Sequence, residues 1–389
     1  MIFLRERIGK LLRDLEGLIY TDETPVSGFR YVQSAEKFPD VSKVNTDDWA
    51  YCDRYPMSWG GHRAYYWFET FVTIPEEMDG QCIVYEQMTG KEDGWDATNP
   101  QFTIYVNDVL KQGLDINHRE VLLTEHAKAG ERYRIMLSAF TGDHNMNLVL
   151  DARIKVLHRE TEKYYYDLKM PYDTACLLRE SDTEYRDIIL NLNESLNLLD
   201  LRKPYSDAYE KSLKAAQDYL DQEFYERYAG VARQKVYCVG HTHIDVAWKW
   251  TLAVTEDKAV RSFSTVLELM RRYPEYKFMS SQPQLYKYVK KNAPQVYEEI
   301  KERVKEGRWD TEGGMFLQAD CNLTSGESLV RQFLYGKRFF REEFGTDNEI
   351  LWLPDVFGYS AALPQIMKKC GIEYFMTTFH PDLILLDMN

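Results

Sequence analysis

The sequence has 389 residues, which is enough for two or three domains of ordinary size. Its formal net charge is −14 at pH 7 and it contains no basic block, which disfavours nucleic acid or a membrane surface as a partner. The six cysteines are scattered without a CxxC pair, and neither a signal-peptide pattern nor a run of about 18 apolar residues occurs, so we expect a cytoplasmic protein that crosses no membrane.

Residues 1–24 form the first predicted unit, an amphipathic helix. Apolar side chains recur near helical spacing between Ile2 and Leu18, so we expect this helix to pack against a neighbour.

Residues 25–160 have a different residue pattern, in which short runs of β-branched and aromatic residues are separated by turn residues. This pattern predicts an antiparallel β-sandwich, with a tight connection at Val106-Asn107-Asp108. Its many aromatic residues are typical of a Tyr- and Trp-rich core, and a carbohydrate-binding surface is the alternative.

Residues 161–232 carry apolar positions at helical spacing and are interrupted at Pro204, which predicts a helical connector. From residue 233 to 389, strand-like runs alternate with helical patterns, which indicates a parallel β/α domain. The strands are expected at 235–240, 276–280, 308–313, 349–353 and 372–377, and the helices at 256–273, 284–306, 327–344 and 361–369.

The stretch GHTHIDVAWKW, which begins at Gly240, places two histidines and an aspartate directly after the first of these strands. Active groups of parallel α/β folds lie beyond the carboxyl ends of strands. Alternate residues of an extended chain share a face and lie about 6.5–7 Å apart, so neighbours among His241, His243 and Asp245 can converge on one metal ion. All three would span about 13 Å, which is too wide for one ion without a bend. The pattern predicts two ligands here, and plain surface polarity is the alternative.

The stretch LWLPDVFGYS, which begins at Leu351, places Asp355 at the end of another strand, on the same expected rim. Metal binding or catalysis and a helix N-cap are both open for this carboxylate. Asp320 follows a third strand, and a cap or loop hydrogen bond is its expected role. Trp248 fits either core filling or a platform beneath a sugar ring.

Four motifs together resemble the class II α-mannosidases, glycoside hydrolase family 38, in their shorter bacterial and cytosolic-type form. They are GHTHIDVAWKW, SSQPQLYKY, GRWDTEGGMFLQADCNLTSGESLVRQFLYGKRFF and LWLPDVFGYS. The resemblance covers most of the chain, from the sandwich to about Thr378.

The resemblance implies a retaining zinc-dependent α-mannosidase that hydrolyses terminal α-mannosides of oligosaccharides, with a seven-stranded β/α barrel as its catalytic domain. It implies that His243 and Asp245 bind Zn²⁺ and that Asp355 is both a zinc ligand and the catalytic nucleophile. The zinc ion would hold vicinal hydroxyls of the mannose ring, and Trp248 would line the sugar subsite. His241 is expected to support the metal site without binding the ion.

The resemblance also places the family's fourth zinc ligand and its acid/base aspartate further downstream than Asn389. We therefore expect an N-terminal fragment with an incomplete barrel, which hydrolyses little or nothing by itself and whose full-length form is a candidate homo-oligomer. Gln318 stands where many relatives carry an acidic residue.

Two other functions stay open at this stage. A metal-dependent amidohydrolase also carries His-x-His after an early barrel strand, although the further barrel histidines and the bridging lysine have no match. A non-catalytic carbohydrate-binding protein would use the sandwich around Tyr65–Trp67 and Trp95. Cleavage of an aryl α-mannoside, as opposed to an amide or ester, separates the enzymes.

Overall fold

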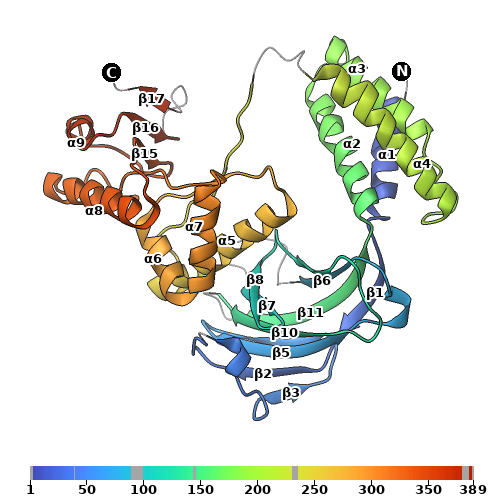
Figure 1. Cartoon of the computed structure of the whole chain (residues 1–389), viewed down its shortest axis with the longest axis horizontal. Helices are drawn as coiled ribbons and strands as arrows, with labels where there is room; N and C mark the ends of the chain where they lie inside the picture. The colour runs from blue at the N-terminus through green and yellow to red at the C-terminus, as the bar shows by residue number, and fades with distance from the viewer. Residues whose placement is uncertain are drawn as a thin grey trace.

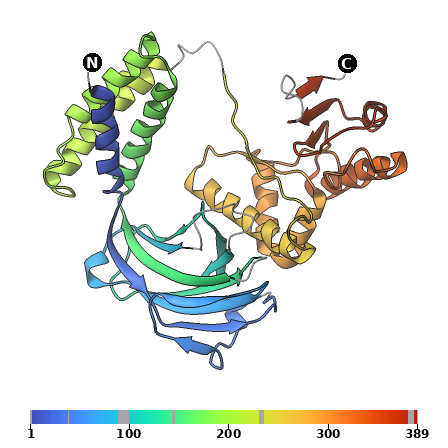
Figure 2. The ribbon, with the colours of Figure 1, turned by 180° about the vertical axis from the view of Figure 1, so that it is seen from behind.

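A computed structural model describes residues 3–38, 40–88, 100–142, 146–229, 235–378 and 385–387 of the chain. Figures 1 and 2 show three groups of elements from opposite sides: a pair of β-sheets, a helical bundle that includes the N-terminal helix, and a mixed group of helices and short strands. The expected multidomain mixed fold is therefore present.

The first group is a sandwich of antiparallel sheets. One sheet has the order β1-β11-β6-β9, with β4 also paired to β11, and the other has the order β3-β2-β5-β10-β7-β8. The elements are β1 (Tyr20–Val26), β2 (Phe29–Gln33), η1 (Val41–Lys43), β3 (Ala50–Cys52), β4 (Met57–Gly61), β5 (Tyr65–Thr73), η2 (Glu76–Met78), β6 (Ile83–Met88), β7 (Gln101–Val106), β8 (Val109–Leu114), β9 (Glu120–Thr124), β10 (Arg132–Phe140) and β11 (Met146–Leu157).

Alternation along the strands builds the core between these sheets. In β10 the side chains of Ile135, Leu137 and Ala139 point inward and are buried, as the period of two in a strand requires. The β7–β8 hairpin turns through Asn107 and Asp108, both with positive φ, at 49° and 67°. This is the geometry of a two-residue type I′ turn, and it confirms the predicted tight connection.

Trp67 lies in a buried cluster with Val41 and Met136, on the face of β5 that points away from the core between the two sheets. The Trp67 ring is buried against Phe38 and Tyr105, with ring centroids 4.9 and 6.0 Å away, and its indole N–H donates to the carbonyl of Glu36 at 2.8 Å. A ring held in this way is part of a buried cluster and not of a binding surface. Trp95, the other aromatic residue of the carbohydrate-binding alternative, lies outside the described residues.

The helical bundle joins two parts of the chain that are distant in sequence. The apolar face of the N-terminal helix, with Ile8, Leu12 and Leu15 buried, packs into the same core as the helices that follow the sandwich. This confirms the prediction that the N-terminal helix packs against a neighbour. The helices are α1 (Leu4–Glu16), α2 (Arg159–Leu177), α3 (Thr183–Asn197), α4 (Asp207–Tyr219) and the π-helical turn η4 (Leu220–Glu226).

The mixed group contains a short strand within or beside each predicted strand, but β12 shares only Gly240 with the strand predicted over 235–240, and residues 235–239 belong to no strand. Strands β12, β13 and β14 form a parallel sheet, β15 pairs in parallel with β16, and β17 pairs antiparallel with β16. A parallel bridge between Gly313 and Leu351 links the two sheets. The elements are β12 (Gly240–His241), α5 (Leu252–Arg272), β13 (Phe278–Met279), α6 (Pro283–Asn292), α7 (Pro294–Lys305), β14 (Trp309–Asp310), α8 (Gly326–Phe344), β15 (Ile350–Leu353), α9 (Leu363–Lys369), β16 (Tyr374–Thr377) and β17 (Leu385–Asp387).

One helix prediction was wrong. The single helix expected over 284–306 is two helices, α6 and α7, separated at Ala293. Ala293 has φ −146° and ψ 68°, outside the helical region. Pro294 has no N–H and disfavours a helical conformation in the residue before it, so it ends one helix and begins the next.

The sandwich packs directly against the mixed group through α5. The backbone N–H of Gly113 in β8 donates to Thr265 Oγ1 in α5 at 3.0 Å. A Cβ atom at Gly113 would lie only 2.8 Å from Arg261 Cβ, so the close approach requires glycine. Arg272, at the end of α5, pairs with Glu120 of β9 at 3.1 Å. The sandwich therefore holds the helix that follows the His/Asp stretch.

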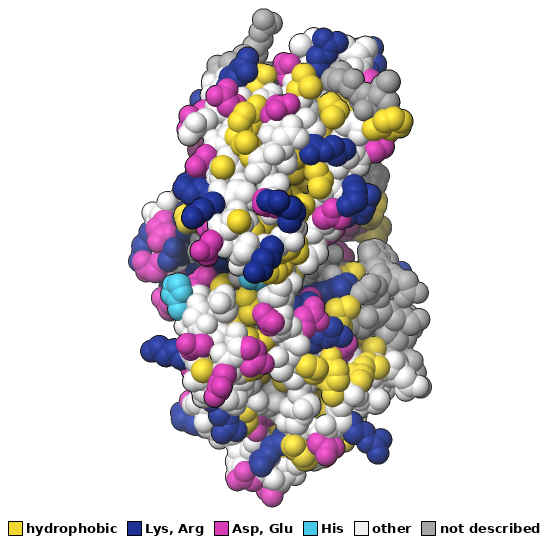
Figure 3. Space-filling model, turned by 90° about the vertical axis from the view of Figure 1, so that its right-hand side faces the viewer, with side chains coloured by type: hydrophobic (Ala, Val, Ile, Leu, Met, Phe, Trp, Pro, Cys, Tyr) yellow, Lys and Arg dark blue, Asp and Glu magenta, His cyan; other side chains and the backbone are white. Residues whose placement is uncertain are grey.

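On the face that Figure 3 shows, acidic and basic side chains are interspersed over the bundle and the sandwich. This face therefore carries no large patch of a single charge that would indicate a strongly charged partner. Within the described residues, no helix combines the length and the apolar character that a membrane crossing needs.

Candidate metal centre

The carboxyl ends of β12 and β15 bring the predicted site residues to one rim. The parallel pairing of β12, β13 and β14, continued to β15 by the bridge at Gly313, points all these strands in one direction. His241 is the last residue of β12, and Asp355 follows the end of β15 by two residues. Their side chains therefore emerge where sites of parallel sheets form.

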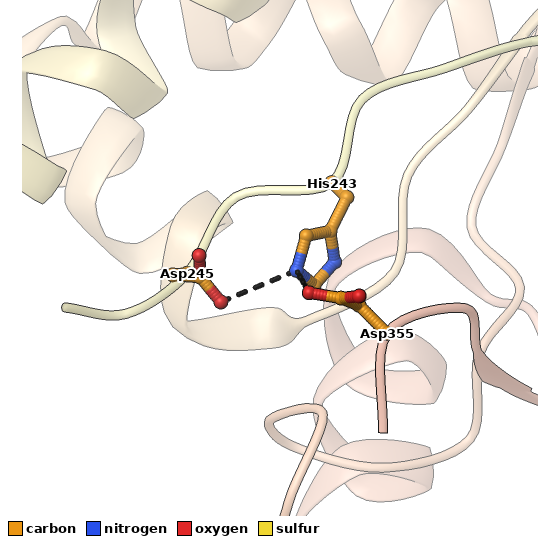
Figure 4. A group of neighbouring side chains, drawn as sticks. All are labelled: His243, Asp245 and Asp355. Carbon is orange, nitrogen blue, oxygen red and sulfur yellow. Dashed lines mark hydrogen bonds and ion pairs between the residues drawn. The ribbon is translucent and has the colours of Figure 1, made fainter. Parts of the chain in front are cut away.

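Three of the predicted side chains meet there. His243 Nε2 lies 3.2 Å from Asp245 Oδ1 and 3.6 Å from Asp355 Oδ2, and Figure 4 shows the imidazole between the two carboxylates. One donor atom from each residue lies within 4.8 Å of the other two. The Asp355 side chain is 51% exposed, so the group is open to solvent on its side.

The geometry of this group fits one divalent cation. Nitrogen and oxygen ligands lie about 2.0–2.2 Å from zinc, so two of them in a tetrahedral site are about 3.3–3.6 Å apart. The two short separations around His243 Nε2 agree with this spacing. One imidazole and two carboxylates are also ordinary ligands of such ions.

His241 lies outside this group. Its Nδ1–H donates to the Met279 carbonyl at 3.0 Å, and its Nε2 accepts from the indole N–H of Trp352 at 3.2 Å. Burial lowers the pKa of His241, and the neighbouring His243 lowers it further, which favours the neutral imidazole. Both ring nitrogens of His241 thus have protein partners, and its supporting role stays a prediction.

The loop that carries Asp355 is fastened on both sides. The Tyr359 hydroxyl donates to the Val356 carbonyl at 2.9 Å and lies 2.6 Å from Thr377 Oγ1. Gly358 has φ 153°, and a Cβ there would meet the Asn322 side-chain nitrogen at 2.2 Å. The loop therefore has little freedom to move the carboxylate away from His243.

Asp320 and Trp248 make contacts with residues other than His243, Asp245 and Asp355. Asp320 Oδ1 accepts the backbone N–H groups of Asn322 and Leu323 at 2.9 and 2.7 Å, which is the loop hydrogen bonding expected for it. Trp248 lies in the loop between β12 and α5 and is 47% exposed. Its ring contacts Trp250 edge-on and Lys249 lies over its face, so the ring is not core filling.

Sequence reasoning did not single out Trp352, Tyr359 or Gln282, although all three lie in the quoted motifs. Trp352 orients His241, Tyr359 holds the Asp355 loop, and the Gln282 amide contacts the backbone beside His243. Each acts through hydrogen bonds between distant segments, and no local spacing in the sequence indicates such bonds.

The matching family model and the proteins of similar sequence agree on one family. Residues 233–380, which include His243, Asp245 and Asp355, match the family model described as "Glycosyl hydrolases family 38 N-terminal domain". "Alpha-mannosidase G" of Dictyostelium discoideum is 31% identical over 400 residues, which cover 96% of this chain and 34% of that protein. "Alpha-mannosidase 2C1" of Homo sapiens is 32% identical over 325 residues, with shares of 80% and 30%. "Alpha-mannosidase" of Saccharomyces cerevisiae is 39% identical over 178 residues, with shares of 46% and 16%. The chain thus spans 34% or less of the length of these relatives.

Proposed function

We propose that the chain, which belongs to glycoside hydrolase family 38, forms part of a retaining, zinc-dependent α-mannosidase that hydrolyses terminal α-mannosides of oligosaccharides. The observation that carries this proposal is the meeting of His243, Asp245 and Asp355 at one rim, inside the segment that matches the family model. A seven-stranded barrel and a cytoplasmic location stay sequence-based predictions.

His243, Asp245 and Asp355 are the residues that would hold Zn²⁺. A bound zinc ion would supply positive charge that grips vicinal hydroxyls of the sugar and favours one orientation of the ring. The exposure of the Asp355 side chain, the largest of the three at 51%, leaves one carboxylate side accessible to a substrate.

Asp355 is proposed as the nucleophile. In a retaining reaction one of its carboxylate oxygens attacks the anomeric carbon while the bond from that carbon to the leaving oxygen breaks, and water later hydrolyses the resulting glycosyl ester. The leaving oxygen takes a proton from an acid, a role that we assign to no residue of this chain. The hydrogen bonds that restrict the loop around Asp355 support this role, because a nucleophile held in a fixed orientation reacts faster.

Trp248 is proposed to line the sugar subsite. It follows Asp245 by three residues, and its ring is 47% exposed. An exposed indole presents a flat apolar face with a polar N–H at its edge, which suits stacking against the apolar face of a sugar.

The test is covalent labelling with a 5-fluoro-mannosyl fluoride of α configuration. Fluoride leaves without protonation, so the reagent needs the nucleophile and not the acid. We expect the purified, zinc-loaded chain to gain the mass of one fluoromannosyl group on the peptide that contains Asp355. The label should disappear with a chelator and in Asp355→Asn, and it should persist in Asp320→Asn, a nearby carboxylate with a loop role.

Three results would count against the proposed function. They are labelling at another residue, labelling that is unchanged when zinc is removed, and the absence of labelling in the zinc-loaded protein. Turnover of an amide or ester, without any reaction at the mannosyl fluoride, would move the assignment to the amidohydrolase alternative.

A further inference from the structure

Gln282 occupies an unusual position between β13 and α6. Its backbone has φ 68° and ψ 83°, a left-handed conformation, and the residue is 4% exposed. A non-glycine residue rarely adopts this conformation, and the following Pro283 restricts the backbone further. Such strain persists only where the surrounding structure requires it, which directs attention to what the side chain does.

The Gln282 amide ties together three segments at the strand ends. Its Nε2 donates to the Ile244 carbonyl at 3.0 Å, and its Oε1 accepts the backbone N–H of Gln318 at 3.2 Å. The Gln318 side chain returns a hydrogen bond to Ser281 Oγ at 2.9 Å. One buried amide therefore joins the loops that follow β12, β13 and β14.

Ile244 is the residue between the two proposed ligands of the first segment, His243 and Asp245. Strand β12 ends at His241, so no sheet pairing holds the backbone at Ile244. The next carbonyl, of Asp245, accepts only longer bonds, from Trp250 Nε1 at 3.3 Å and Thr255 Oγ1 at 3.4 Å. Among the described residues, the hydrogen bond from Gln282 is thus the shortest that this stretch of backbone makes with the end of another strand.

We propose that Gln282 is a positioning residue for the metal centre: its amide fixes the backbone at Ile244 so that His243 and Asp245 present their donor atoms together. Only a side chain with a donor and an acceptor at its end satisfies both the carbonyl of Ile244 and the N–H of Gln318. The inference rests on the metal-binding part of the proposed function and adds a residue outside the ligand set.

The test measures zinc affinity in two variants that differ in backbone strain. Gln282→Ala and Gln282→Gly both remove the amide, but glycine tolerates φ 68° and alanine does not. We expect both variants to lose about 10–100-fold in affinity for Zn²⁺, the usual effect of removing a group that orients a ligand. The denaturation midpoint of the metal-free protein should be higher for the glycine variant than for the alanine variant. The two variants should therefore lose zinc affinity to a similar extent while differing in stability.

Cobalt provides a readout that a general loss of stability would not change. The visible absorption of Co²⁺ bound to the wild-type chain reports the ligand geometry, and we expect both Gln282 variants to alter its band positions. The control is Gln112→Met, which removes another buried amide, one that donates to the carbonyls of Gly113 and Glu120 in the sandwich. This control should keep the wild-type zinc affinity and cobalt spectrum.

The outcomes separate the two proposals. If the wild-type chain binds zinc and His243→Ala abolishes the binding, but both Gln282 variants stay within twofold of the wild type, only the positioning role is overturned. An equal loss of affinity in Gln112→Met also overturns it. If the wild-type chain has no zinc affinity that His243→Ala removes, the proposed metal centre fails and the role of Gln282 fails with it.

Discussion

Asp355 differs from the other two proposed ligands in its origin. His243 and Asp245 are two residues apart in one segment, whereas Asp355 comes from the loop after β15, more than a hundred residues later. An ion bound by all three would therefore join two segments that are also connected by the hydrogen bond from Trp352 to His241 and, through the sheets, by the Gly313–Leu351 bridge. Binding to the folded state alone stabilises that state, because the unfolded chain keeps the ligands apart.

We expect zinc at about 100 times its dissociation constant to raise the free energy of unfolding by about 2.7 kcal/mol. Asp355→Asn should lose most of this gain, because an amide is a poor ligand for zinc and the link between the segments is broken. Denaturant titrations with zinc and with a chelator measure the difference. Asp320→Asn should respond to zinc as the wild type does, and an equal zinc response in Asp355→Asn would show that Asp355 is not a ligand.

At the scale of elements, the contact between β8 and α5 positions the start of the β/α region. Gly113 allows the strand to lie against Arg261, and its N–H is bonded to Thr265. Lys37, between β2 and the helical turn η1, reaches Asp257 of α5 at 2.8 Å. The helix is therefore held by packing and by charge pairs from the sandwich.

Gly113→Ala tests this contact. The added methyl group would lie 2.8 Å from Arg261 Cβ, and overpacking of this kind costs about 1–3 kcal/mol. We expect the denaturation midpoint to fall accordingly. Gly326→Ala is the matched control, because a Cβ there meets nothing within 4 Å and alanine favours the helix by up to about 1 kcal/mol. Equal midpoints for the two variants would contradict a close contact at Gly113.

His158 connects the sandwich to the bundle at the start of α2. Its ring stacks on Tyr205, with centroids 4.1 Å apart, and its Nε2 lies 2.9 Å from Thr21 Oγ1. Burial lowers the pKa of His158, and the charge of Asp22 opposes this shift only in part. The neutral imidazole is therefore the form that the folded junction favours.

The sign of the pH dependence follows from this shift. The unfolded chain takes up the proton near pH 6.5, roughly the ordinary histidine value, while the folded chain takes it up at lower pH. The contribution of neutral His158 is thus complete above that pH and is lost as the pH falls through the folded-state pKa. We expect the unfolding free energy to fall more steeply between pH 7 and pH 5 in the wild type than in His158→Gln. An equally steep fall in His158→Gln would show that His158 is not the source of this pH dependence.

Local pattern predicted the elements, and long-range contacts decided their arrangement. The strands of the β/α region and the Asn107-Asp108 turn follow from periodicity and turn residues. Spacing indicated that only two of His241, His243 and Asp245 share one ion, and the family resemblance indicated that His241 is the one outside the group. The break at Pro294 was missed because the apolar helical pattern continues across it. The bond from Gln282 to Ile244 could not be predicted either, because it joins residues 38 positions apart and depends on a left-handed backbone.

At the scale of the whole molecule, residues 235–239, which precede β12, form an exposed segment with several apolar side chains. In Figures 1 and 2 they run as an extended trace that leads into the β/α region. Val236 and Tyr237 are 84% and 87% exposed, and Val239 is 50% exposed. Strand β12, which follows, is paired on one side only among the described residues, so an apolar segment leads into an open sheet edge.

An exposed apolar segment at a sheet edge favours self-association of the chain, because unpaired backbone groups and apolar side chains are available together. Replacing Val236 and Tyr237 with lysine in one double variant should raise the concentration at which the protein remains monomeric, measured by light scattering, and should lower the binding of an apolar dye. Zinc affinity should not change, because neither side chain contacts the proposed ligands. The control is Leu177→Lys, which removes an equally exposed apolar side chain, at 87%, from the end of α2, away from any sheet edge. If this control suppresses association as well as the double variant does, general surface hydrophobicity is the cause and the edge beside β12 is not.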